Sequence, residues 1–151
     1  MAHAKSYQEL DVYKLSKQLA KDIFQLSKRF PKEEMYSLTD QIRRSSRSIG
    51  AQVAEAWAKR RYEKHFISKL TDADGEQQET KHWIDTASDC GYLSDAEVKD
   101  LSSRYASVGK MLNNMIGKSH LFCFKDSKSS NGITIDHRSP ITDHNESNNE
   151  N

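Results

Sequence analysis

Hydrophobic residues recur with helical spacing in four long segments of the chain, separated by short breaks. These segments cover residues 7–29, 37–61, 62–90 and 94–124, and their apolar positions return every three or four residues. Pro31 ends the first segment, because proline disfavours helical geometry in the residue before it. No segment alternates with the period of two that is typical of a half-buried strand. Long amphipathic helices joined by short connections predict an all-α fold, an antiparallel up-down four-helix bundle.

Local signals mark the expected helix ends. Ser37 and Asp40 are spaced as an N-cap pair before the second helix, and Ser94 and Glu97 form a capping box before the fourth. Gly91 suits the left-handed position that follows the third helix. The apolar seam of that third helix has a small or polar centre and consists of Phe66, Leu70, Ala73, Gln77, Thr80, Ile84 and Ala87.

Small side chains lie along the edges of two of these apolar faces. Ser46, Gly50, Ala54 and Ala58 form a stripe at every fourth position of the second helix, and Gly75 lies beside the seam of the third. Glycine costs about 1 kcal/mol relative to alanine inside a helix. Because side chains without bulk let another helix approach closely, we expect these five residues to contribute to close helix packing, including contacts between subunits.

Residues 125–151 have a different composition from the rest of the chain. Serine, asparagine and aspartate dominate this stretch, and its apolar residues follow no period. Such a segment buries too little surface to offset the entropy of ordering it. The sequence therefore predicts two regions, a four-helix bundle over residues 1–124 and a disordered tail over residues 125–151.

Hydropathy and cysteine content indicate the cellular location that we expect for the protein. The mean hydropathy is −0.88, and no apolar run is long enough to cross a bilayer. The two cysteines, Cys90 and Cys123, are too far apart in sequence to indicate a disulfide framework or a metal knuckle. We therefore expect a cytoplasmic protein with no membrane partner.

The net charge of +1 is the sum of one positively charged region and two negatively charged regions. Residues 1–61 carry +6, residues 62–124 carry −3 and residues 125–151 carry −2. Basic side chains gather on the polar face of the second helix and at its C-terminal end: Arg43, Arg44, Arg47, Lys59, Arg60 and Arg61.

Two interpretations of this basic cluster remain open. Guanidinium groups match phosphate oxygens, so the cluster could bind RNA or DNA. Alternatively, the cluster pairs with the acidic third helix, either within the chain or across a subunit interface. We expect the tryptophans and tyrosines to serve in core or interface packing, because they do not interleave with the basic cluster as a stacking platform would. These are Trp57, Trp83, Tyr13, Tyr36, Tyr62 and Tyr105.

Candidate chemistry is sparse along the chain. Glu79 and His82 have the spacing of a di-iron bundle ligand pair, but that site needs two such pairs and two further glutamates. The run from Asp72 to Glu76 lacks the glycine and glutamate positions of a calcium-binding loop. We therefore predict no catalytic residue, no metal site, no cofactor and no small-molecule substrate, and hence a protein that is not an enzyme.

Several short stretches occur in an order that resembles one known family. They are Leu10-x-Val12, Phe30-Pro31-x-x-Glu34, Leu38-Thr39-x-Gln41-Ile42-Arg43-Arg44-Ser45, Ser48-Ile49, Ala54-Glu55, Gly75 and Gly91-Tyr92-Leu93. Over about residues 7–120, they resemble the four helix bundle protein family, also known as the 23S rRNA intervening-sequence proteins. The resemblance implies an antiparallel bundle that assembles as a ring-like homopentamer. A related branch, the accessory variability determinants of diversity-generating retroelements, binds a reverse transcriptase and nucleic acid through a basic pentameric barrel.

The residues and the resemblance together predict a non-enzymatic oligomeric scaffold, homopentameric by resemblance, that binds a protein or RNA partner. In such a ring, the basic second helix of one subunit faces the acidic third helix of the next. The alternative is an RNA- or DNA-binding accessory factor, one that could serve a reverse transcriptase, acting through the basic face of the second helix.

Overall fold

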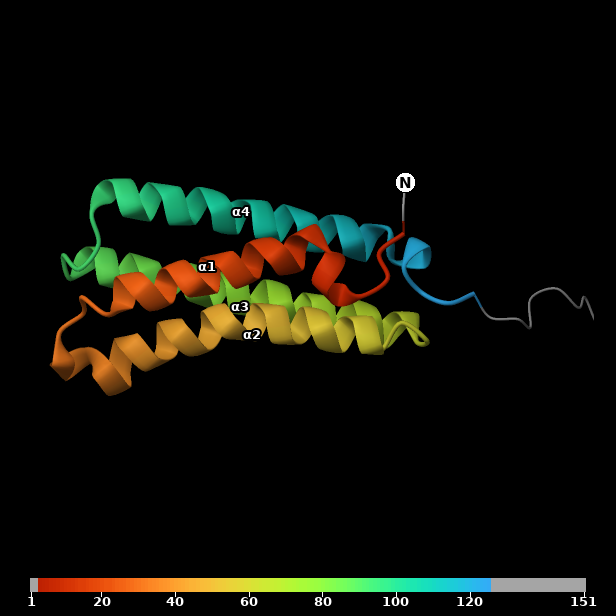
Figure 1. Ribbon diagram of the computed structural model, residues 1–151, viewed down its shortest axis with the longest axis horizontal. Coiled ribbons are helices and arrows are strands. Elements are labelled where there is room, and N and C mark those ends of the chain that lie inside the picture. Colours follow the sequence, from red (N-terminus) through yellow and green to blue (C-terminus); the bar gives the residue numbers. More distant parts are fainter. Residues whose placement is uncertain (1–2, 126–151) are drawn as a thin grey trace, which may run out of the picture.

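The computed structural model describes residues 3–125, which fold into four antiparallel α-helices (Figure 1). The helices are α1 (Asp11–Ser27), α2 (Asp40–Ala58), α3 (Glu63–Asp89) and α4 (Asp95–Gly117). Each helix packs against the one that follows it, and α4 closes the bundle by packing against α1. The predicted all-α four-helix bundle is confirmed.

Apart from Lys125, the predicted disordered tail lies outside the described residues. None of the four helices combines the length and apolar character needed to cross a membrane.

The core of the bundle follows the predicted helical seams. All seven predicted seam positions of α3, from Phe66 to Ala87, are the buried residues of that helix. Two of them bring polar groups into the core. Thr80 Oγ1 lies 2.8 Å from the carbonyl oxygen of Glu76 and 2.9 Å from Ser45 Oγ of α2, so the two hydroxyls form a buried hydrogen-bonded pair. Gln77 is only 2% exposed and packs against the buried Gly109 of α4.

The connection between α3 and α4 has the predicted stop and start signals. Gly91 has a φ of +76°, the left-handed conformation that favours glycine. Ser94 Oγ accepts a hydrogen bond from the Glu97 backbone N–H at 3.2 Å, and Glu97 Oε1 accepts one from the Ser94 backbone N–H at 2.9 Å. The capping box is therefore confirmed.

The connection between α1 and α2 differs from the expectation. The predicted N-cap role of Ser37 is wrong, because Ser37 lies inside a π-type turn, Met35–Thr39, that leads directly into α2. Its hydroxyl instead donates to the carbonyl oxygen of Glu34 at 3.5 Å. The first backbone N–H groups of a helix need acceptors, and here the carbonyl oxygens of the preceding turn supply them. The start of α2 therefore needs no side-chain cap.

Candidate functional site

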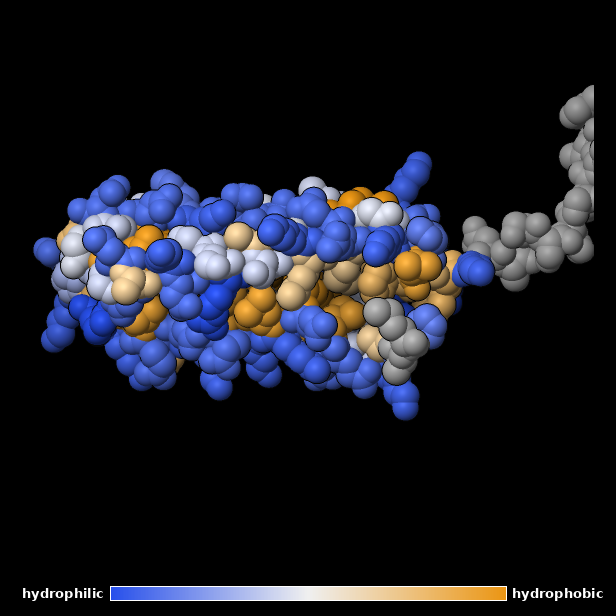
Figure 2. Space-filling model, turned by 90° about the horizontal axis from the view of Figure 1, so that it is seen from above, coloured by the Kyte–Doolittle hydropathy of each residue, from blue (hydrophilic) through white to orange (hydrophobic). Residues whose placement is uncertain are grey.

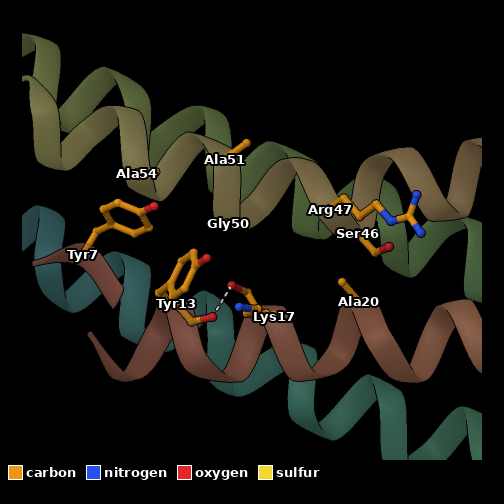
Figure 3. Close-up of a pocket in the computed structure, with 10 residues that line it drawn as sticks. Tyr7, Tyr13, Lys17, Ala20, Ser46, Arg47, Gly50, Ala51 and Ala54 are labelled. Atoms are coloured by element: carbon orange, nitrogen blue, oxygen red, sulfur yellow. Dashed lines mark hydrogen bonds between the residues drawn. The ribbon is translucent and has the colours of Figure 1, made fainter. Parts of the chain in front are cut away.

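A groove runs along the outer face of the bundle between α1 and α2 (Figure 3). Its volume is about 240 Å³, and its floor and walls include small side chains from both helices. Tyr7 and Tyr13 close one end with rings that meet edge to face, their centroids 4.9 Å apart. The residues that line this α1–α2 groove are Tyr7, Tyr13, Ser16, Lys17, Ala20, Ser46, Arg47, Gly50, Ala51 and Ala54.

Part of the predicted small-residue stripe packs on α1 of the same chain. Ser46 is buried, and a Cβ placed on Gly50 would lie 3.4 Å from Tyr13 Cε2, which is van der Waals contact. Ala54 is half-buried in the groove, and Ala58 is exposed beyond it. Gly75 differs from all of these, because a Cβ placed there would meet no atom within 4 Å.

Arg47 is the residue that joins the groove to the surface around it. Besides the groove, it lines a hollow beside Phe24 of about 520 Å³ and another along α2 of about 610 Å³. The guanidinium of Arg47 lies 5.4 Å from the centroid of the Phe24 ring, and that of Arg43 lies 4.8 Å from it. Lys28 Nζ approaches the same ring at 4.8 Å, so three cations surround one half-buried aromatic side chain.

Sequence reasoning missed Phe24. The residue lies off the apolar seam of α1, and a phenylalanine at a polar position between lysines is the signal that could have identified it. Its cationic neighbours on α2 follow only from how α1 and α2 are aligned in the folded bundle.

Arg44 is paired within the chain. Its Nη2 donates to Glu79 Oε2 at 2.6 Å, and its Nη1 lies 3.6 Å from Glu76 Oε1, with both acids on α3. The hydrogen bond to Glu79 raises the pKa of Arg44, while partial burial raises the pKa of Glu76. For this residue the structure realises the pairing of the basic second helix with the acidic third.

The C-terminal end of α2 forms a separate group. The Arg60 guanidinium stacks on the Trp57 ring at 3.6 Å, lies 4.8 Å from the Phe124 ring, and donates from Nε to the Trp57 carbonyl oxygen at 2.8 Å. Burial lowers the pKa of Arg60. Lys59 and Arg61 are exposed on either side. Trp57 packs against the core as expected, but the expectation that it does not interleave with basic residues is wrong, since the Arg60 side chain covers its ring.

The six predicted basic residues do not converge on one site. Arg47 and Arg60 are 13 positions apart, which corresponds to about 20 Å along a helix axis. The structure thus divides the cluster into three: Arg43 and Arg47 beside Phe24, Arg44 paired with α3, and Lys59, Arg60 and Arg61 at the end of the bundle.

Exposed acidic side chains lie on α3, away from the groove. Asp72, Asp85 and Asp89 are exposed, and none of them forms an ion pair with residues 3–125. The same holds for Lys17 and Arg47 at the groove. Among the described residues no three His, Cys, Asp or Glu side chains come together as metal ligands would.

The fold and the site define an all-α protein, an antiparallel four-helix bundle whose outer face carries a cationic groove. The chain belongs to the 23S rRNA-intervening sequence protein family, which it matches over residues 8–114. The resemblance noted from the sequence is therefore confirmed.

The chain is also similar to a solved structure. This is the crystal structure of a protein with unknown function from the S23 ribosomal protein family of Bacteroides thetaiotaomicron VPI-5482. The two share 28% sequence identity with a TM-score of 0.64, over 70% of this chain and 95% of the other. No curated protein matches the chain.

Proposed function

We propose that the protein is a non-enzymatic scaffold that assembles into a closed ring of identical subunits, with five subunits as the resemblance implies. The observation that carries this proposal is the α1–α2 groove, where small side chains are flanked by cations without ion-pair partners within residues 3–125. A helix of a second copy can approach the part of the groove around Gly50, Ala51 and Ala54 closely, because the side chains there are small.

Charge complementarity supports a second copy as the occupant. The outer face of α3 combines Gly75, open to solvent, with the exposed carboxylates of Asp72 and Asp85. These acids complement Lys17 and Arg47 at the groove. Because the groove and the α3 face are different surfaces of one chain, their contact is heterologous. Repeated contacts of this kind form a ring when the rotation between subunits closes, and an open filament when it does not.

The contacts of the basic residues favour this assembly over a nucleic-acid surface that runs the length of α2. Arg44 is already neutralised by Glu76 and Glu79, and Arg43 donates from Nε to Ser27 Oγ at 2.8 Å. A partner at the groove therefore meets few free cations from α2. It meets a shaped, mostly apolar hollow instead.

Light scattering coupled to size-exclusion chromatography tests the proposal. The expected result is a particle of several times the monomer mass of 17.3 kDa. Ala51→Trp fills the groove from an exposed position, so it should shift the particle toward monomer while the circular dichroism spectrum stays unchanged. Ala96→Trp, at an exposed alanine in the first turns of α4, is the matched control and should leave the mass unchanged.

A charge exchange sharpens the test. Arg47→Glu alone should weaken assembly, and combination with Asp72→Lys should restore it if the two residues face each other across the contact. A wild-type protein that stays monomeric at micromolar concentration would contradict the proposal, as would an Ala51→Trp variant that assembles like the wild type.

A further inference from the structure

One end of the bundle presents large apolar side chains to solvent. This end holds the α2–α3 connection, the turn Ser119–Leu121 and the last described residues (Figure 1). Tyr62 is 59% exposed, Leu121 61% and Phe124 63%. In the face that Figure 2 shows, hydrophobic side chains are concentrated toward this same end. None of these residues lines the α1–α2 groove.

Aromatic and cationic side chains are stacked at this end. The Arg60 guanidinium is close to two rings, 3.6 Å from the centroid of Trp57 and 4.8 Å from that of Phe124, and we call these three side chains the Trp57–Arg60–Phe124 column. The Phe124 backbone N–H donates to the Arg60 carbonyl oxygen at 3.2 Å, which holds the backbone of Phe124 beside the α2–α3 connection. The column therefore ends in an aromatic side chain that is mostly open to solvent.

The two chain segments that contain Arg60 and Phe124 are strongly positive in charge. Residues 59–65 and 117–125 contain one acid, Glu63, whose carboxylate accepts a hydrogen bond from the Ser119 hydroxyl. The cations in these two stretches are Lys59, Arg60, Arg61, Lys64, Lys118 and Lys125.

We propose that this end of the bundle binds a single-stranded polynucleotide. One base continues the Trp57–Arg60–Phe124 column by stacking on Phe124, and phosphates of the strand contact Lys59 and Arg61. Such a site has two parts: cations that contact the phosphate backbone, and exposed aromatic rings on which any base can stack. Neither part distinguishes ribose from deoxyribose, so both RNA and DNA strands fit the site. The column is what favours this ligand over a lipid surface, because an aromatic–guanidinium stack is extended by a flat ring and not by an acyl chain.

Fluorescence anisotropy with the full chain and a labelled oligouridylate of about 12 nucleotides tests the stacking contact. Phe124→Leu keeps an apolar side chain but removes the ring, and should weaken binding about tenfold. An oligothymidylate of the same length should behave alike. Since Phe124 is exposed, the thermal unfolding of the variant should match that of the wild type.

A second variant tests the phosphate contacts. Lys59→Gln combined with Arg61→Gln should flatten the slope of log K against log salt concentration by about 1.4, since each single-strand contact contributes about 0.7. The matched control replaces two exposed lysines at the other end of the bundle, Lys32→Gln with Lys99→Gln, and should leave the slope unchanged.

Three results would overturn the proposal. The first is no binding of either oligonucleotide at about 50 mM salt. The second is binding that is insensitive to Phe124→Leu, which would reduce the site to a nonspecific charge contact. The third is co-sedimentation with vesicles of phosphatidylcholine and phosphatidylserine without oligonucleotide binding, which would assign the end to a membrane. Because none of these variants alters the groove, the outcome is separate from that of the oligomerisation test.

Discussion

Glu97 connects α4 to the end of α1, and its charge links stability to pH. The same oxygen, Oε1, accepts a hydrogen bond from Arg29 Nη2 at 2.8 Å and from the Ser94 backbone N–H at 2.9 Å. The Arg29 guanidinium and then the Ser94 amide lower the pKa of Glu97 from 4.5 to about 2. Because the ionised form is the one that these contacts stabilise, removal of the charge should cost stability only where Glu97 is ionised.

The sign and size of the effect follow from these values. The folded-state pKa lies below the unfolded value of 4.5, so the stabilisation is complete above that pH and is lost as the pH falls toward 2. A shift of this size corresponds to about 3 kcal/mol without screening. Since the side chains of Arg29 and Glu97 are 52% and 26% exposed, solvent screening reduces the expected contribution to about 1 kcal/mol.

Urea unfolding of Glu97→Gln measures this contribution. Glutamine retains an acceptor for the Ser94 amide, so the variant removes the charge and leaves the capping box. We expect a loss of about 1 kcal/mol in the free energy of unfolding near pH 7, falling to less than half of that near pH 3. Glu33→Gln, at an exposed glutamate with no side-chain hydrogen bond among the described residues, is the control. A loss as large at pH 3 as at pH 7 would refute the reasoning.

Three other predictions concern packing and pairing. Gly109→Ala should cost up to about 2 kcal/mol net, because its Cβ would lie 3.0 Å from Nε2 of the buried Gln77 and this crowding outweighs the gain in helix propensity of about 1 kcal/mol. Gly75→Ala, which meets open space, should instead add up to about 1 kcal/mol; equal effects of the two substitutions in urea unfolding would contradict this contrast. Phe66→Ala removes a fully buried ring and should cost about 3–5 kcal/mol by thermal unfolding, and a loss below 1 kcal/mol would argue against its place in the core. Arg44→Ala should cost no more than about 1 kcal/mol, with the loss shrinking as salt rises, and a salt-independent loss would count against the ion pair with α3.

The helical seams could be predicted from the sequence because burial in a bundle repeats with the helix period. The seven seam residues of α3, including the polar Gln77 and Thr80, needed only spacing to be identified. The capping box at Ser94 was equally local, since its two partners are three residues apart. Ser37 shows the limit of such reasoning, because its cap spacing is correct while the preceding π turn already supplies the hydrogen bonds.

The candidate site could be predicted only as far as it depends on one helix. The basic face of α2 was apparent, but its partners lie on other elements: Phe24 on α1, Glu79 on α3 and Phe124 near the end of the described chain. Those contacts are set by how the helices are aligned and by where the C-terminal segment docks. Both depend on the packing of the whole bundle, which no local window of sequence contains.

The buried Ser45–Thr80 pair favours one register of α2 against α3. A slip of one turn, about 5.4 Å along the axis, would separate the two hydroxyls and leave each with only the carbonyl of its own helix, Glu76 for Thr80 and Ile42 for Ser45. The lost hydrogen bond between the helices is worth about 0.5–1.5 kcal/mol, a preference that an interface of leucine and isoleucine alone would not provide. The polar centre of the seam therefore discriminates against misaligned bundles and helps to specify a single native arrangement.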